Sequence, residues 1–186
     1  MDLKLVQSLN NLAGTFPWLD VIMIFIAEKG LFVVAILLVT LWFMDLGVAR
    51  KKNQYAIIMG LEALLLGRGV VTIILREIFP RVRPFVDNNS INLLIAKDAF
   101  EPSFPSGHAV MGFALALAVF IYNRKAGIWL IVVSVLIGLA RVFAGAHYPS
   151  DIIGGFFVAL GVVFFLNYYR HIFVAPVVNF FNKKGQ

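Results

Sequence analysis

The chain contains 186 residues, of which 61% are hydrophobic and 14% are charged, and it carries a formal net charge of +6. Soluble domains are about half apolar and about a quarter charged, so this composition excludes a soluble globular enzyme and a disordered chain. Because a helical crossing of a bilayer takes about 20 residues, the length allows at most about six or seven crossings. We therefore expect one all-α integral membrane domain over residues 1–186.

The first predicted element is a short amphipathic helix over residues 3–13, with apolar side chains on one face and polar side chains on the other. We expect this helix to lie at the membrane interface. The apolar stretch 18–44 follows, and Glu28-Lys29-Gly30 interrupts it. The interruption favours a hairpin of two spans, over 17–28 and 31–45, although a single long helix is the alternative.

Four further apolar stretches complete a predicted six-helix bundle. They cover residues 54–78, 106–122, 127–143 and 150–170. The longest stretch that is not apolar is 79–105, between the third and fourth predicted spans of a compact chain. Loops of this length in such a chain are usually functional.

The basic side chains predict the orientation of the bundle. The loops at 45–53 and 123–126 and the tail after residue 170 carry Lys and Arg, and short loops of this kind stay in the cytoplasm. Lys4 is assigned to the same side, so both termini are predicted to be cytoplasmic. The positive charge then reflects membrane anchoring, and we predict membrane lipids but no nucleic acid as partners.

Three polar segments are predicted to meet on the opposite, outer side of the membrane. One follows the 54–78 span, one begins the 106–122 span, and one joins the last two spans. The segments are Arg76 to Phe85, Pro105-Ser106-Gly107-His108, and Arg141 to Asp151.

This set of residues predicts a phosphate-binding site. Arg76, Arg83 and Arg141 bring three guanidinium groups together, and guanidinium forks match phosphate oxygens. Ser106 and Gly107 open a helix, whose free backbone N–H groups attract an anion. Gly107 is also expected to let the backbone approach closely.

Two histidines add chemistry that a binding site alone does not need. A neutral His147 can attack phosphorus and form a phosphohistidine. Asp151, four residues later, is expected to hold one ring N–H of His147 and so expose a lone pair on the other nitrogen. His108 is then the general acid that protonates the leaving oxygen and later activates water. The chain has no cysteine, which excludes disulfides and thiolate chemistry.

The pattern resembles the signature of the type 2 phosphatidic acid phosphatase superfamily. The first motif of that family is a basic residue, six residues and then Arg-Pro. Arg76 and Arg83-Pro84 match it, with Arg at the position where Lys is usual. The second motif, Pro-Ser-Gly-His, is matched in full at 105–108.

The third motif is matched by Arg141, His147 and Asp151, with Ala140 in place of the usual serine. The replacement removes one hydroxyl donor, so we expect weaker phosphate binding. The resemblance implies a six-span membrane phosphatase that forms a phosphohistidine and uses neither a metal ion nor another cofactor.

Within the superfamily, Arg-Pro-Phe at 83–85 and the region of Glu28 resemble the small bacterial undecaprenyl-diphosphate phosphatases. The resemblance implies release of phosphate from undecaprenyl diphosphate at the outer face of the cytoplasmic membrane. The motifs leave open phosphatidylglycerophosphate, another phospholipid or lipid A as the substrate. A lipid phosphotransferase of the same fold is another alternative, and a small non-enzymatic transporter is a remote one.

Several charged residues have two interpretations each. Arg81 and Lys97 are either phosphate contacts or solvated loop charges, and Glu28 is a candidate for the border of the site. Asp98 and Glu101 are interpreted as surface residues, because no cluster of metal ligands accompanies them.

Glu62 and Arg68 lie within an apolar span, where ionisable groups are functional hypotheses by default. Six residues place them about 120° apart on a helix, so we do not expect them to pair. His171 is interpreted as an interface residue, and the small residues of the last three spans as sites of close helix packing.

Overall fold

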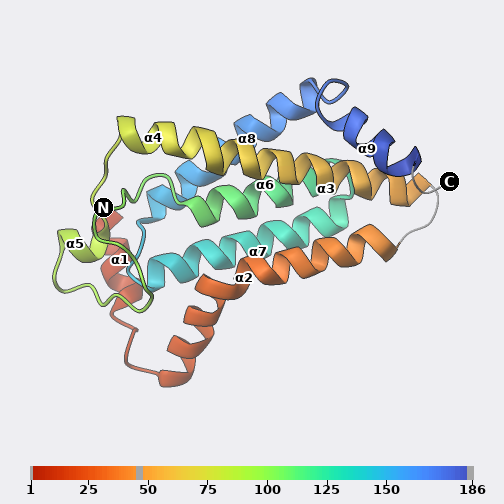
Figure 1. Ribbon diagram of the computed structural model, residues 1–186. Helices are drawn as coiled ribbons and strands as arrows, with labels where there is room; N and C mark the ends of the chain where they lie inside the picture. Colours follow the sequence, from red (N-terminus) through yellow and green to blue (C-terminus); the bar gives the residue numbers. More distant parts are fainter. Residues whose placement is uncertain (1, 45–47, 184–186) are drawn as a thin grey trace.

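The computed structural model describes residues 2–44 and 48–183, and within these ranges the chain forms helices and loops but no strand (Figure 1). The elements in chain order are α1 (Asp2–Asn10), α2 (Pro17–Met44), α3 (Val48–Leu66), the π-helical turn η1 (Gly67–Val71), α4 (Thr72–Ile78), α5 (Pro84–Asp87), α6 (Gly107–Tyr122), α7 (Arg124–Phe143), α8 (Pro149–Tyr168) and α9 (Val174–Lys183).

Helix α6 forms the centre of the bundle, with α3, α7 and α8 packed around it. Small side chains allow this close approach. A Cβ atom on Gly112 of α6 would lie 2.9 Å from Ser134 Oγ of α7, and one on Gly155 of α8 would lie 2.7 Å from Ala109 Cβ of α6. The predicted close packing at small residues is therefore confirmed.

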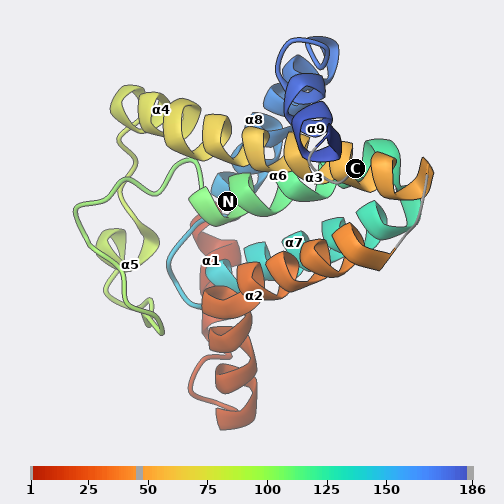
Figure 2. The same ribbon diagram turned by 45° about the vertical axis from the view of Figure 1, so that its right-hand side comes forward.

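Helix α2 is continuous from Pro17 to Met44, so the predicted hairpin is wrong. The helix bends part-way along: its first part leans away from the bundle, and its second part runs beside α7 (Figures 1 and 2). Glu28 and Lys29 are exposed, so their charges do not require a loop. Gly30 is the point of close approach to α7, since a Cβ atom there would lie 2.5 Å from Ile137 Cγ1.

The continuous α2 bears on the number of crossings. Among the described residues, four helices are long and apolar enough to cross a membrane, and α6 is a shorter apolar helix. The predicted six crossings are not confirmed, and we propose five. The four long helices are α2, the continuous run from α3 to α4, α7 and α8.

The two ends of the chain lie at opposite ends of the bundle (Figure 1). Asp2 forms a salt bridge with Arg81, beside the three motifs, whereas α9 packs on α3 at the far end. This arrangement does not confirm the prediction that both termini share one side of the membrane.

Several predicted boundaries also move. Helix α3 already begins at Val48, so Arg50, Lys51 and Lys52 lie in a helix and not in a loop; residues 45–47 of that predicted loop and Lys184 lie outside the described residues. Helix α7 begins at Arg124, and the loop before it shrinks to Asn123, which caps α7 by accepting a hydrogen bond from the Ala126 N–H.

Helix α9 was not predicted. It is held by Val174 and Val178, both fully buried, which lie one helical turn apart. They join the core cluster that α3, α6 and α8 build.

The predicted N-terminal helix forms as α1, at the end of the bundle where the three motifs lie. The Asn10 amide donates to Phe143 O and Asn92 O, 2.8 Å each, and Val6 is fully buried. Helix α1 thus packs against the ends of α7 and α8.

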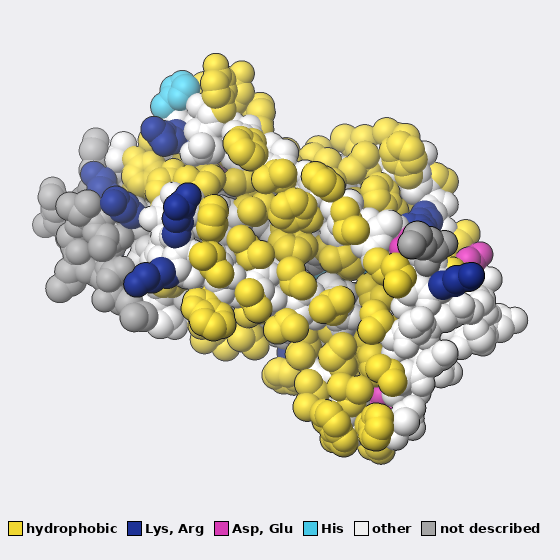
Figure 3. Space-filling view, turned by 180° about the vertical axis from the view of Figure 1, so that it is seen from behind, with side chains coloured by type: hydrophobic (Ala, Val, Ile, Leu, Met, Phe, Trp, Pro, Cys, Tyr) yellow, Lys and Arg dark blue, Asp and Glu magenta, His cyan; other side chains and the backbone are white. Residues whose placement is uncertain are grey.

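On the face shown in Figure 3, apolar side chains cover the middle of the molecule, and Lys and Arg side chains gather toward its ends. Leu65, Phe157 and Phe164 are each more than 60% exposed. Such a continuous apolar surface fits a bilayer and not water, and the chain is a membrane protein.

Candidate active site

The three motifs meet at one end of the bundle because the long segment before α6 folds back over the loop between α7 and α8. Backbone hydrogen bonds fix it there: Ser106 N–H donates to Asp151 O at 3.1 Å and Leu94 N–H donates to Ala144 O at 3.2 Å. Ser103 N–H also donates to Arg81 O at 2.8 Å. The second and third motifs are therefore in direct contact.

Arg83 is the most enclosed cation of the site, with 0% of its side chain exposed. Its Nε donates to Glu101 O at 2.9 Å, its Nη1 to Ala146 O at 3.0 Å, and its Nη2 to Glu101 Oε2 at 3.1 Å. These bonds fix the direction of the guanidinium plane.

The ring of His147 lies between a carboxylate and this guanidinium. Its Nδ1 is 3.4 Å from Asp151 Oδ2, and its Nε2 is 3.3 Å from Nη1 of Arg83. Because a guanidinium group can only donate, Nε2 carries the lone pair and Nδ1 carries the proton. This tautomer is the one that the predicted nucleophile requires.

The environment also keeps His147 neutral. Burial lowers the pKa of His147 to about 4; the nearby Asp151 opposes this shift, and the charge of Arg83 adds to it. The usual pKa of the imidazole is about 6.5. At neutral pH the ring is therefore uncharged.

Asp151 is fully buried and holds both its neighbours in place. Its Oδ2 accepts from the Tyr148 N–H at 2.9 Å, which caps the first turn of α8. Its Oδ1 accepts from Arg81 Nη1 at 2.9 Å. The carboxylate next to His147 thus has a fixed orientation.

Arg81, a predicted phosphate candidate, is engaged on the far side of Asp151. Besides Asp151, its guanidinium bonds to Ser150 Oγ and to Asp2 Oδ2 and stacks on the Tyr148 ring. Ser150 in turn donates to Asp2. We call Asp2, Arg81, Ser150 and Asp151 the N-terminal clasp. No sequence signal pointed to it, because Asp2 lies far from the motifs along the chain.

Other polar groups of the site have no hydrogen-bond partner among the described residues. They are Nε of Arg76, Nε and Nη2 of Arg141, and Oγ of Ser106, besides Nδ1 of His147, which lies 3.4 Å from Asp151 Oδ2. Arg141 and Ser106 are almost fully buried, and buried polar groups are normally hydrogen-bonded. These converging donors fit the oxygens of an anion. The phosphate cradle at these groups stays a prediction.

His108 lies in the first turn of α6 and is partly buried. It is close enough to His147 and Arg141 for their charges to act on it. The structure therefore brings both histidines to the same site.

Lys97 and Glu101 extend the site on its outer side. Glu101 Oε2 pairs with Lys97 Nζ at 3.4 Å as well as with Arg83. Although partial burial opposes the shift, Lys97 and Arg83 lower the pKa of Glu101. Asp98 accepts from the Phe100 N–H instead. Among the described residues, no group of three His, Asp or Glu side chains has the arrangement of a metal site.

The remaining predicted residues differ in position. Glu28 is exposed, but its charge acts on Arg141, whose Nη1 donates to Ala27 O at 3.4 Å. Glu62 stays within α3 with a buried Oε2 that has no described partner. His171 is exposed at the far end of the bundle.

Sequence reasoning singled out Arg68 as an ionisable residue in an apolar span but did not place it at the site. Its side chain lies against Gly107, where a Cβ atom would be 2.5 Å from Arg68 Nε. The eight-residue spacing from Arg76 gave no signal, because in a regular α-helix it turns the two side chains to different faces.

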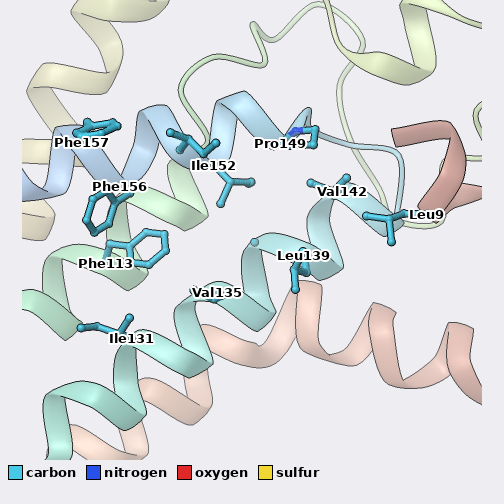
Figure 4. Close-up of a pocket in the computed structure, with 12 residues that line it drawn as sticks. Leu9, Phe113, Ile131, Val135, Leu139, Val142, Pro149, Ile152, Phe156 and Phe157 are labelled. Atoms are coloured by element: carbon cyan, nitrogen blue, oxygen red, sulfur yellow. The ribbon is translucent and has the colours of Figure 1, made fainter. Parts of the chain in front are cut away.

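An apolar groove begins beside the loop that carries His147. It has a volume of about 540 Å³ and is lined by α6, α7, α8 and Leu9 of α1 (Figure 4). Val142 and Pro149 stand at the loop end, and the groove continues to Ile131 and Phe157 nearer the middle of the bundle.

Comparisons with known proteins agree with this geometry. The chain is 32% identical over 167 residues to the undecaprenyl-diphosphatase BcrC of Bacillus subtilis, covering 89% of this chain and 83% of that relative. It is 35% identical over 156 residues to YbjG of Escherichia coli, described as a putative undecaprenyl-diphosphatase, covering 83% and 75% of the two chains.

A solved structure shows the same fold. The crystal structure of LpxE from Aquifex aeolicus matches with a TM-score of 0.68 at 28% identity, covering 88% of this chain and 93% of that one. The family model described as the PAP2 superfamily matches residues 54–174, which include all three motifs. The chain belongs to the PAP2 superfamily of membrane phosphatases.

Proposed function

We propose that this lipid phosphatase removes the terminal phosphate of undecaprenyl diphosphate at the outer face of the cytoplasmic membrane. The names of the two relatives support the substrate. The observation that carries the chemistry is the neutral His147 ring between Asp151 and Arg83. A neutral imidazole with a directed lone pair is a nucleophile for phosphorus.

In the first step, Nε2 of His147 attacks the terminal phosphorus. The bond from this phosphorus to the bridging oxygen breaks, and its electron pair stays on that oxygen. Protonated His108 donates a proton to the oxygen, which leaves as undecaprenyl phosphate. Arg76, Arg83 and Arg141 bind the terminal phosphate oxygens, together with Ser106 and the Gly107 N–H.

In the second step, water hydrolyses the phosphohistidine. Neutral His108 accepts a proton from the water as its oxygen attacks phosphorus, and the P–N bond breaks with its electron pair returning to Nε2. Inorganic phosphate leaves, and both histidines return to their starting states. Guanidinium and backbone N–H groups supply the positive charge, so we propose that no metal ion takes part.

The groove between α7 and α8 is the proposed place for the start of the polyprenyl tail. It is apolar, and it begins next to the loop that carries His147. The tail then stays in contact with lipid while the headgroup enters the site. In this proposal the site faces outward, because the far end of the bundle carries the basic residues of α3 and α7, and such residues stay in the cytoplasm.

The histidine mechanism is tested by His147→Ala and His108→Ala in detergent-purified protein. Phosphate release is expected to fall by at least about 100-fold in each, since each removes a group that takes part in bond breaking. His171→Ala at the far end is the matched control and should retain activity. Near-normal turnover in either site variant would contradict the mechanism, as would a loss of wild-type activity in chelator that Mg²⁺ restores.

The substrate is tested by a phosphate-release panel of undecaprenyl diphosphate, phosphatidylglycerophosphate, phosphatidic acid and lipid A. We expect a preference for undecaprenyl diphosphate of about tenfold or more, equivalent to about 1.4 kcal/mol in the barrier. A preference for a monophosphate lipid would move the chain to another branch of the family. Transfer of phosphate to an added lipid acceptor in place of water would identify a phosphotransferase.

A further inference from the structure

Arg68 is the one basic residue that lies well inside the span formed by α3, η1 and α4. It precedes Arg76 by eight residues, which places it roughly 10 Å closer to the middle of the bundle along the helix. Glycines at 67 and 69 flank it, and a carboxylate partner for Arg68 is absent from the salt bridges of the described residues. An ionisable group at such a depth has a functional explanation by default.

The π-helical turn determines the direction of Arg68. An α-helix turns by about 100° per residue, so eight residues would leave Arg68 about 80° away from the face of Arg76. The Thr72 N–H donates to Gly67 O, five residues earlier, and a π turn therefore accommodates one extra residue. The rotation from Arg68 to Arg76 then equals that of about seven α-helical residues, which is about 20° short of two full turns. Both arginines face the start of α6.

Contacts agree with this geometry. The Arg68 side chain lies over Gly107, with Nε, Cδ and Cζ at 2.5, 2.9 and 3.4 Å from the position of a Cβ atom. Arg76 Nη2 is 3.5 Å from Pro105 O. The charge of Arg68 acts on both Arg76 and His108. Gly107 thus admits Arg68 to the site.

This location is electrostatically costly without an anion. The N-terminus of a helix carries partial positive charge and disfavours a cation, and Arg76 adds like-charge repulsion. With a structural role alone, Arg68 would remain in two unfavourable interactions, with the helix N-terminus and with Arg76. An anion between Arg68 and the first turn of α6 makes the interactions with both positive groups favourable.

We propose that Arg68 binds the lipid-side phosphate of a diphosphate substrate and stabilises it as the leaving group. The inference rests on the proposed function. Arg83 and Arg141 hold the terminal phosphate near His147, and the second phosphate lies toward the tail and therefore deeper in the bundle, where Arg68 is. The bridging oxygen takes the electron pair of the broken P–O bond beside His108, which supplies its proton. Arg68 neutralises the charge of the departing lipid monophosphate.

The test compares farnesyl diphosphate with farnesyl monophosphate, which share one tail. Arg68→Met is expected to lower kcat/KM for the diphosphate by about 10- to 100-fold, which is the effect of losing a charged hydrogen bond. The same substitution should change kcat/KM for the monophosphate by less than about threefold. Arg68→Lys should recover part of the loss. Arg124→Met, at the far end of the bundle, is the matched control for loss of an arginine.

A binding measurement separates this role from a folding defect. Inorganic pyrophosphate should inhibit the wild type more strongly than orthophosphate does, and Arg68→Met should weaken inhibition by pyrophosphate alone. Equal losses with the two farnesyl substrates, or equally weakened inhibition by both anions, would overturn the inference while leaving the phosphatase mechanism intact. Failure of the wild type to hydrolyse farnesyl diphosphate would overturn the proposed function and this inference with it.

Discussion

His147 lies between two charged groups that have opposite effects on the protonation of its ring. Asp151 favours a protonated imidazole, whereas burial and Arg83 favour the neutral one, and burial is the largest effect. The outcome matters because only the neutral ring has a lone pair for phosphorus. The site therefore uses a carboxylate to orient the histidine without charging it.

The first prediction concerns pH and stability. The unfolded chain binds a proton at His147 near pH 6.5, and the folded chain resists it to about pH 4. The stability from burying the neutral ring is therefore fully present above pH 6.5 and lost as the pH falls toward 4. His147→Gln, which does not titrate, should show a shallower fall in Tm between pH 6.5 and 5 than the wild type.

The control for this measurement is His171→Gln, which changes an exposed histidine and should leave the slope unchanged. Parallel curves for the wild type and His147→Gln would show that the folded state does not depress the pKa of this ring.

The residues of the three motifs were predictable because their chemistry is local to short segments of sequence. Arg83, His147 and Asp151 meet as expected. Arg68 stood out as a charge in an apolar span, but its position at the site was not predictable, because its direction depends on a π turn that residue spacing does not indicate. For Arg81 the sequence left open a phosphate contact or a solvated loop charge, whereas in the structure it pairs with the distant Asp2 and with Asp151.

At the scale of elements, helix α2 shows why apolar patterning identifies spans better than turns. Glu28 and Lys29 interrupt the apolar run, yet both are exposed and helical. Their exposure depends on where α2 packs against α7, which is a matter of tertiary structure and not of local sequence. Helix α9 was not predicted for a related reason. Its two buried valines stabilise the helix only through packing on α3, which the local sequence does not indicate.

The second prediction concerns the groove between α7 and α8. Val135 lines it and is 43% exposed, so Val135→Trp should fill it. KM for undecaprenyl diphosphate is expected to rise by about tenfold or more, because each methylene kept out of the groove forfeits about 0.8 kcal/mol. KM for a short substrate that does not reach the groove should change little.

Val132→Trp is the matched control. Val132 lies on the same helix with the same 43% exposure but does not line the groove. A similar rise of KM in both variants would exclude the groove as the place of the tail.

At the scale of the whole molecule, the two ends of the chain lie at opposite ends of the bundle, as the proposed five crossings require. Lys4 therefore moves to the end that holds the motifs. The basic residues that still indicate the cytoplasmic side lie in the first turns of α3 and α7. The cations at the other end belong largely to the site itself.

The third prediction tests this topology, and the absence of cysteine makes it direct. Asn11→Cys and Asp98→Cys, both at exposed positions near the motif end, should react with a membrane-impermeant maleimide on intact cells. Lys125→Cys at the far end should react only after permeabilisation. Labelling of Asn11→Cys and Lys125→Cys under the same condition would restore an even number of crossings.

The N-terminal clasp also has a consequence for biosynthesis. Asp2 and Ser150 are separated by 148 positions in the chain, so Asp2 is made long before its partner at the start of α8. Chains are made at about 5–20 residues per second, and the delay is therefore several seconds or more. Throughout that interval Asp2 lacks Ser150, and the N-terminal clasp closes only when α8 has been made.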